Sequence, residues 1–215
     1  MVACVAERAS VPDNLDRDWR MRDLTGQGAW AQLPLIVQRR FSVPPARGIP
    51  KLYKGRVLET RLSWAGWVLA QAARLVGAPI PLDHGATGSS TVSVTEDEAI
   101  GGQVWTRVYA RSGRFPQVIH SAKRFRGPTG LEEYIGSGVC MELAVTVERG
   151  CLIFRSQRYV LQWRGRRSCI PALVCPGRME IVHEQVSPSQ FSFLLTLHHP
   201  WFGMLLRQEA LYCDT

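Results

Sequence analysis

Residues 103–163 of the chain read QVWTRVYARSGRFPQVIHSAKRFRGPTGLEEYIGSGVCMELAVTVERGCLIFRSQRYVLQW. This stretch contains short segments rich in β-branched and aromatic residues, and each segment ends at a glycine, a proline or a charged turn. The segments are Val104–Ala110, Phe115–Phe125, Leu131–Ile135, Val139–Val147 and Cys151–Trp163. Closely spaced strand-like segments separated by turn residues predict an antiparallel meander of the sandwich or barrel type.

The flanking sequence extends this meander. Further strand-like runs are Leu52–Leu62, Thr91–Thr95, Arg178–Val186 and Phe191–His198, while Met204–Tyr212 fits a last strand or a short helix. Apolar residues at helical spacing predict helices over Trp30–Phe41 and Trp64–Val76. Strands and long helices do not alternate, which disfavours a parallel sheet. We therefore predict a mainly β (α+β) fold, an antiparallel β-barrel or half-barrel meander of about nine to ten strands with two helices.

The length of 215 residues fits one ordinary domain, or one domain with an ordered N-terminal extension. Residues 1–28 are polar and charged, so we expect a loose leader there and a single β-rich domain over residues 29–215. No apolar run is long enough for a transmembrane segment, and no secretory signal pattern opens the chain. The six cysteines form no C-x-x-C pair, which favours reduced thiols and a cytoplasmic location.

A formal charge of +8 raises the question of nucleic-acid binding. Only three of the 26 basic residues are lysines, and the arginines are spread along the whole chain. The densest cluster, residues 164–167, reads as a charged hairpin tip in solvent. There is also no helix-turn-helix, zinc-finger or base-stacking motif. We therefore expect no nucleic-acid partner.

The segment Trp64–Val76 is apolar on nearly every side of the predicted helix. Such a helix is buried on most sides or lies against lipid. It is too short to span a bilayer. Packing across a sheet or along a barrel opening is therefore favoured over contact with a membrane.

Strand parity selects candidate ligand-binding residues. Trp105, Arg107 and Tyr109 alternate along one strand and share one face. An arginine between two aromatic rings is typical of a wall that holds an anion. Lys123 on the next strand is a further candidate for the same site. The alternative is a solvent-exposed face with cross-strand ion pairs, which gives the same pattern.

Motifs for catalysis and metal binding are weak. No H-x-H, H-E-x-x-H or G-x-S-x-G motif and no glycine-rich phosphate loop occurs, so we expect no metal and no cofactor. A metal site assembled from distant strands by His120, His183 and Glu142 stays open as an alternative. An acid–base enzyme without a cofactor also stays open, with Glu142 or His120 as the base and Arg107 holding an oxyanion.

Several short sequences carry a resemblance to a known family. They are Val104-Trp105-Thr106-Arg107, Val118-Ile119-His120-Ser121, Gly130-Leu131-Glu132-Glu133-Tyr134-Ile135-Gly136, Cys175-Pro176-Gly177 and His199-Pro200-Trp201-Phe202-Gly203. In this order they resemble the bacterial domain-of-unknown-function 4166 family, from about Leu33 to the C-terminus. That family often follows a saccharopine-dehydrogenase-like domain. The resemblance thus implies a bacterial origin and a dehydrogenase-like partner, and it implies no particular activity.

The sequence supports three hypotheses for function. The first is binding of an apolar, acid-bearing small molecule, lipid-like or resembling a secondary metabolite, in a β-barrel cavity. The second is a cofactor-independent isomerase, cyclase or hydrolase on the same scaffold. The third is an interaction module that docks on an oxidoreductase. We place the first hypothesis ahead, because mixed polar and aromatic strand faces accompany one wholly apolar helix.

Overall fold

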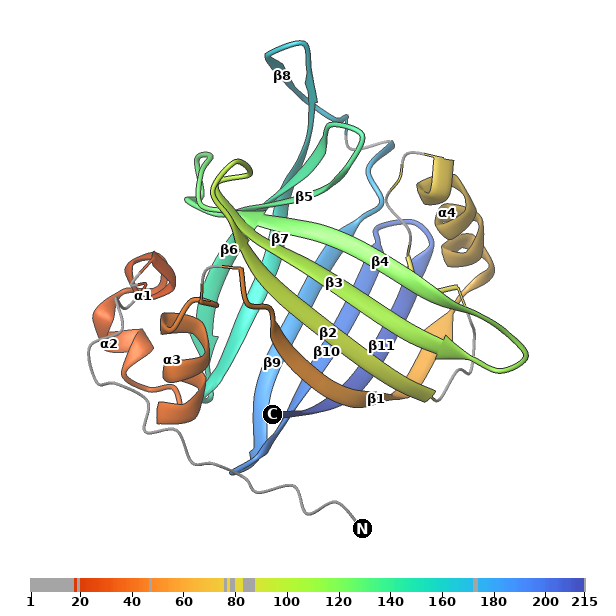
Figure 1. Cartoon of the computed structure of the whole chain (residues 1–215). Helices are drawn as coiled ribbons and strands as arrows, with labels where there is room; N and C mark the ends of the chain where they lie inside the picture. Colours follow the sequence, from red (N-terminus) through yellow and green to blue (C-terminus); the bar gives the residue numbers. More distant parts are fainter. Residues whose placement is uncertain are drawn as a thin grey trace.

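Antiparallel pairing joins every strand in the computed structural model (Figure 1), which describes residues 18, 20–46, 48–75, 77, 80–82, 88–171 and 174–214. The strands are β1 (Lys51–Leu62), β2 (Gly88–Asp97), β3 (Gly102–Arg111), β4 (Arg114–Arg124), β5 (Glu132–Gly136), β6 (Val139–Glu148), β7 (Cys151–Trp163), β8 (Arg166–Cys169), β9 (Arg178–Ser187), β10 (Gln190–His199) and β11 (Gly203–Asp214). The order across the sheet is β6-β5-β4-β3-β2-β1-β11-β10-β9-β7-β8.

The sheet closes on itself because β6 pairs with β7 as well as with β5. The ring therefore holds every strand except β8, which pairs with β7 outside it. The predicted antiparallel β-barrel is confirmed, in its closed form rather than as a half-barrel. The structure has eleven strands in its described residues, slightly more than expected, and the last run of the sequence forms strand β11.

Two-residue turns explain two of the hairpins. Glu148 pairs with Cys151, and both turn residues between them have positive φ, 52° at Arg149 and 77° at Gly150. The β7–β8 hairpin repeats this geometry at residues 164 and 165. Positive φ at both central positions is typical of the type I′ turn, whose twist matches that of the flanking strands. The charged cluster at residues 164–167 therefore does include a hairpin tip.

Four short helices accompany the barrel in the described residues: α1 (Arg20–Thr25), α2 (Gln27–Trp30), α3 (Leu35–Ser42) and α4 (Trp64–Leu75). The expectation of two helices was wrong in number. The predicted helix Trp30–Phe41 is interrupted at Pro34, whose ψ of 140° is extended and which precedes α3. Proline lacks the amide hydrogen that a helix interior requires. The other predicted helix corresponds to α4, and Val76 lies outside the described residues.

Most of the expected leader, residues 1–28, lies outside the described residues. The described part of it forms α1 and the start of α2. Met21 on α1 is buried, and Arg20 forms ion pairs with Asp18 and, across the fold, with Glu96 of β2. In Figure 1 the helices α1, α2 and α3 lie beside β6, on the opposite side of the barrel from α4.

Helix α4 packs closely on β11. The Ser63 amide donates to the Leu205 carbonyl at 3.0 Å, and Ser63 Oγ accepts from the Gly66 amide at 3.1 Å, as an N-cap does. A Cβ on Gly66 would lie 2.0 Å from the Leu205 carbonyl oxygen, so only glycine fits this approach. No helix in the described part of the chain has the length and apolar character needed to cross a membrane.

Candidate functional site

The barrel contains a cavity of about 440 Å³. Its volume lies in the range of sites that hold small-molecule ligands, which is roughly 300–1,000 Å³. Helix α4 contributes Leu69 and Ala73 to the lining, and α3 contributes Phe41. Most of the other lining side chains are apolar and come from the barrel strands, as Met141, Phe154 and others do. A small number of polar groups interrupts this apolar wall.

The candidate ligand-binding residues of the sequence lie in this wall. Trp105, Arg107 and Tyr109 of β3 line the cavity together, and Lys123 of β4 lines it as well. Lys123 Nζ lies 5.0 Å from the centre of the Trp105 ring, and Arg107 Cζ lies 5.9 Å from it. The Tyr109 hydroxyl donates to Gln208 Oε1 at 3.3 Å, and burial raises the pKa of Tyr109.

A carboxylate that the sequence did not single out completes this group. Lys123 Nζ donates to Glu133 Oε2 at 3.1 Å, and Arg107 Nη2 lies 3.6 Å from Glu133 Oε1. Arg107 Nη1 also donates to Ser121 Oγ at 3.0 Å. Glu133 belongs to β5, where it is paired in register with Lys123 of β4. We call Arg107, Lys123 and Glu133 the cavity triad.

Burial and charge act against each other at Glu133. Burial alone would raise the pKa of the carboxyl, but Lys123 and Arg107 outweigh it and lower the pKa to about 2. Glu133 is therefore ionised at neutral pH. With both bases protonated, the cavity triad has two positive charges against one negative charge. Burial lowers the pKa of Lys123, and the neighbouring Arg107 adds to that shift while Glu133 opposes it.

The catalytic candidates do not come together. Arg107 faces the cavity, whereas Glu142 of β6 is buried beside Arg167 of β8 and Arg158 of β7, with N–O distances of 3.5 and 3.7 Å. His120 of β4 borders the cavity as well, next to Ile119 and Ser121 in the same strand. Its ring is exposed and lies 3.1 Å from Thr106 Oγ1. The structure thus places neither of the two predicted bases, Glu142 and His120, in direct contact with Arg107.

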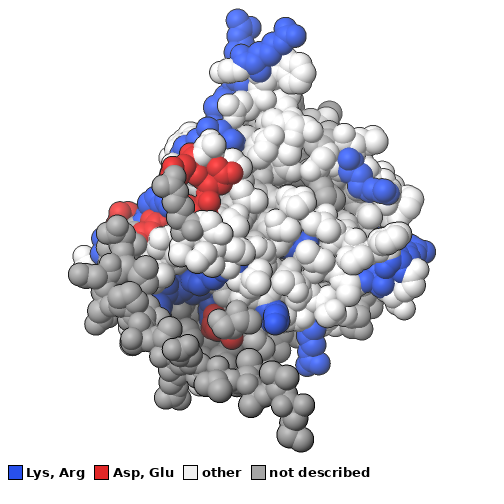
Figure 2. Space-filling view, in the orientation of Figure 1, with Lys and Arg blue, Asp and Glu red and all other residues white. Residues whose placement is uncertain are grey.

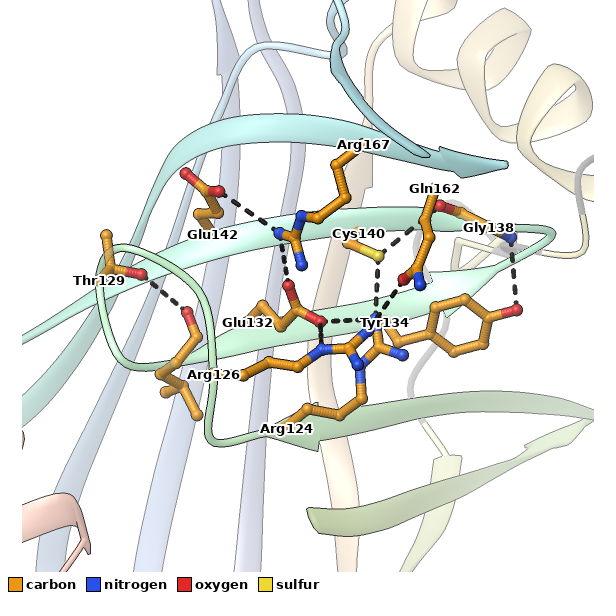
Figure 3. Close-up of polar contacts among 11 residues, drawn as sticks. Arg124, Arg126, Thr129, Glu132, Tyr134, Gly138, Cys140, Glu142, Gln162 and Arg167 are labelled. Carbon is orange, nitrogen blue, oxygen red and sulfur yellow. Dashed lines mark hydrogen bonds and ion pairs between the residues drawn. The ribbon is translucent and has the colours of Figure 1, made fainter. Parts of the chain in front are cut away.

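A second charged cluster connects the β7–β8 hairpin to the barrel (Figure 3). Glu132 is fully buried; it accepts hydrogen bonds from Arg126 at 2.5 Å and Arg167 at 2.7 Å, and it forms an ion pair with Arg124 at 2.6 Å. Burial would raise the pKa of Glu132, but the hydrogen bonds from Arg126 and Arg167 lower it overall. Arg124 also contacts Cys140 Sγ at 3.0 Å. We call Glu132 with its three arginines the hairpin cluster, in which Arg167 of β8 is joined to Glu132 of β5.

Metal-binding groups are not assembled in the described residues, where no three His, Cys, Asp or Glu side chains could hold one ion. His183 is fully buried and stacks on Phe191, with Nε2 2.9 Å from Arg40 Nη1. Burial, and secondarily Arg40, lowers the pKa of His183 to about 3, so its ring is neutral and Nε2 accepts from Arg40. The open alternative of a site shared by His120, His183 and Glu142 therefore finds no support in this geometry.

Basic side chains do not gather into a single surface. Figure 2 shows Lys and Arg at the tip of the β7–β8 hairpin and at several separate places on the visible face. Many arginines are paired, as Arg155 is with Glu180 at 2.6 Å and Arg207 with Glu59 at 2.5 Å. The net positive charge is thus dispersed over the face shown.

Comparison with known proteins identifies the family. The model of a family described as a domain of unknown function (DUF4166) matches residues 33–211. The chain belongs to the DUF4166 family. No curated protein and no solved structure matches it. The match covers most of this DUF4166 chain, including α3, α4 and almost the whole barrel. The bacterial origin and the dehydrogenase-like partner stay predictions.

A partial signal for an acidic partner of Lys123 was present in the sequence. Gly127-Pro128 marks a turn, and residues equally far from it on the two flanking segments face each other across a hairpin. Counting outward from Gly127 and Pro128 places Lys123 opposite Glu132, whereas the structure pairs Lys123 with Glu133, one residue further along. The sequence thus indicated an acidic partner for Lys123 without its register. The burial of Glu142 had no comparable signal, because it depends on a hairpin that folds back from β7.

Proposed function

We propose that this protein binds an apolar small molecule that carries an acidic group. The observation that supports the proposal is a largely apolar cavity in the barrel whose few polar lining groups include the cavity triad. The apolar part of the ligand would occupy the space lined by Leu69, Met141 and Phe154. Its acidic group would lie at Arg107 and Lys123.

The charge of the cavity triad favours an anion. Two cations share the single carboxylate of Glu133, and a buried charge without a counter-ion is costly. A ligand carboxylate at Arg107 would balance this excess, and hydrogen bonds between ionised partners are short and strong. The Trp105 indole Nε1 is also buried and has no hydrogen-bond partner among the described residues. A ligand oxygen could accept from that donor.

Binding is favoured over acid–base catalysis on the same scaffold. A general base works best when its pKa lies near the working pH. Glu133 has a pKa of about 2 and is held by Lys123, so it is a poor base. Glu142 pairs with Arg167 and does not line the cavity, whereas His120 borders the cavity with an exposed ring that contacts Thr106 rather than Arg107.

Titration calorimetry with dodecanoic acid and dodecanol tests the proposal. These ligands share an alkyl chain and differ in the acidic group. We expect the acid to bind at least about tenfold more tightly than the alcohol, because the charged contact contributes about 1.5–3 kcal/mol. Arg107→Gln should remove most of this preference. Arg158→Gln, outside the cavity, should retain it. Equal affinity for the two ligands, or binding of neither, would refute the proposal.

A further inference from the structure

Large apolar side chains lie in solvent on and beside α4. Seven of them are between 43% and 89% exposed. They are Trp64, Trp67, Val68 and Leu75 of α4, together with Trp201, Phe202 and Met204 of the β10–β11 hairpin. We call these seven residues the α4 face. A group of neighbouring exposed apolar side chains marks an interaction site more often than single exposed apolar side chains do.

The two parts of the α4 face form one surface. The Trp64 and Phe202 rings meet edge to face, with centroids 5.9 Å apart. The close approach of Gly66 to Leu205 and the Ser63 hydrogen bond fix the helix on the strand that begins at this hairpin. The indole rings of Trp64 and Trp201 therefore lie on a helix and a hairpin that are packed firmly against each other.

Charge around the α4 face is positive. Arg74 follows Trp67 by two helical turns and is exposed. Strand register places Met204 beside His198 and His198 beside Arg178, and both of these neighbours are exposed. Residues 64–75 and 200–206 contain no Asp or Glu. In the right half of Figure 2, where Figure 1 shows α4, basic side chains are visible and acidic ones are not.

The same helix borders the cavity. Leu69, Ala72 and Ala73 line it, while Trp64, Trp67 and Val68 on the same helix are exposed. Helix α4 therefore separates the cavity from the α4 face by its own thickness. An apolar ligand that enters beside α4 passes from one apolar surface to another. Such a position suits a ligand that is supplied from an apolar phase.

From these observations we infer that the α4 face docks on an anionic lipid bilayer and that the cavity exchanges its ligand with that bilayer. Tryptophan is favoured at the boundary between headgroups and acyl chains because its ring is apolar and its N–H is polar. Arginines on the same face attract anionic headgroups. The docking rests on the α4 face alone, whereas the exchange step rests on the proposed function.

Flotation with vesicles tests the docking. We expect the protein to float with phosphatidylcholine vesicles that contain phosphatidylglycerol and to float at least about tenfold less with phosphatidylcholine alone. Trp67→Glu and Trp201→Glu should each reduce flotation about tenfold or more. Trp163→Glu is the matched control, because Trp163 is 64% exposed on the β7–β8 hairpin, and it should float as the wild type does. Arg74→Gln should weaken the preference for phosphatidylglycerol without altering the apolar surface.

Other outcomes overturn the inference. Absence of flotation, or equal loss in Trp163→Glu, would do so. A dimer in light scattering that Trp67→Glu dissociates would show that a second copy covers the α4 face. Binding of dodecanoic acid measured without vesicles separates the two proposals. The Trp67→Glu variant should still bind the acid, because Trp67 belongs to the α4 face and does not line the cavity. A protein that floats with vesicles but does not bind dodecanoic acid would refute the proposed ligand and keep the docking. A protein that binds dodecanoic acid but does not float would refute the docking alone.

Discussion

Lys123 Nζ and Glu133 Oε2 lie 3.1 Å apart across β4 and β5, and the two side chains are only 4% and 6% exposed. Their attraction acts in a region from which water is largely excluded, so it is much stronger than that of a surface pair. Desolvation of both charges opposes it. Removing one partner leaves the other buried without its counter-ion, and this asymmetry makes the pair testable.

We predict that Glu133→Gln lowers the free energy of unfolding by about 3–5 kcal/mol, as removal of one partner of a buried ion pair does. Glu148→Gln should have little effect, because its carboxylate pairs with Arg155 at the surface. Because the folded-state pKa of Glu133 is lowered to about 2 from 4.5, its stabilisation is present above pH 4.5 and lost as the pH falls toward 2. Denaturant unfolding should show the wild type and Glu133→Gln converging over that window. A constant difference would contradict this account.

His183 makes a different prediction for acid stability. Its pKa is lowered to about 3 from 6.5, so below pH 6.5 the unfolded chain takes up a proton that the folded chain does not. The free energy of unfolding should fall by about 1.4 kcal/mol per pH unit between pH 6.5 and 4.5. In His183→Phe, which keeps a ring beside Phe191, this slope should largely disappear. The exposed His120→Gln is the control, and a wild-type slope in His183→Phe would refute the assignment.

Two glycines give a matched pair of substitutions. A Cβ on Gly66 would meet the Leu205 carbonyl at 2.0 Å, whereas a Cβ on Gly28 of α2 would have no neighbour within 4 Å. Gly66→Ala should therefore destabilise the protein by about 1–3 kcal/mol through overpacking. Gly28→Ala should stabilise it by about 0.5–1 kcal/mol through helix propensity. Thermal unfolding measures both, and a neutral Gly66→Ala would mean that α4 moves away from β11 without cost.

Local signals account for what the sequence predicted. Alternation along residues 104–110 placed Trp105 and Arg107 on one face, and turn residues marked the hairpins of the meander. Closure of the barrel had no such signal, because β7 pairs with β6, β8 and β9, and the pairing with β9 joins residues far apart in the chain. Helix α1 is short and polar, and it is held in place by the packing of Met21. That contact becomes evident only once the barrel surface exists.

The last prediction concerns Glu132, the buried carboxylate that the three arginines of the hairpin cluster share, and Arg167, the arginine of that cluster on β8. Glu132→Gln leaves Arg124 buried without its carboxylate and should cost about 3 kcal/mol or more in global stability. Arg167→Gln removes the ion pair between β8 and Glu132, so it should act mainly on β8. Hydrogen exchange should then quicken at the amides of β8 and its partner residues in β7, while the melting temperature changes little. Arg166→Gln, at the exposed neighbouring position, should leave the exchange unchanged. Quickened exchange throughout the barrel in Arg167→Gln would show that the hairpin supports the whole fold instead of being held by it.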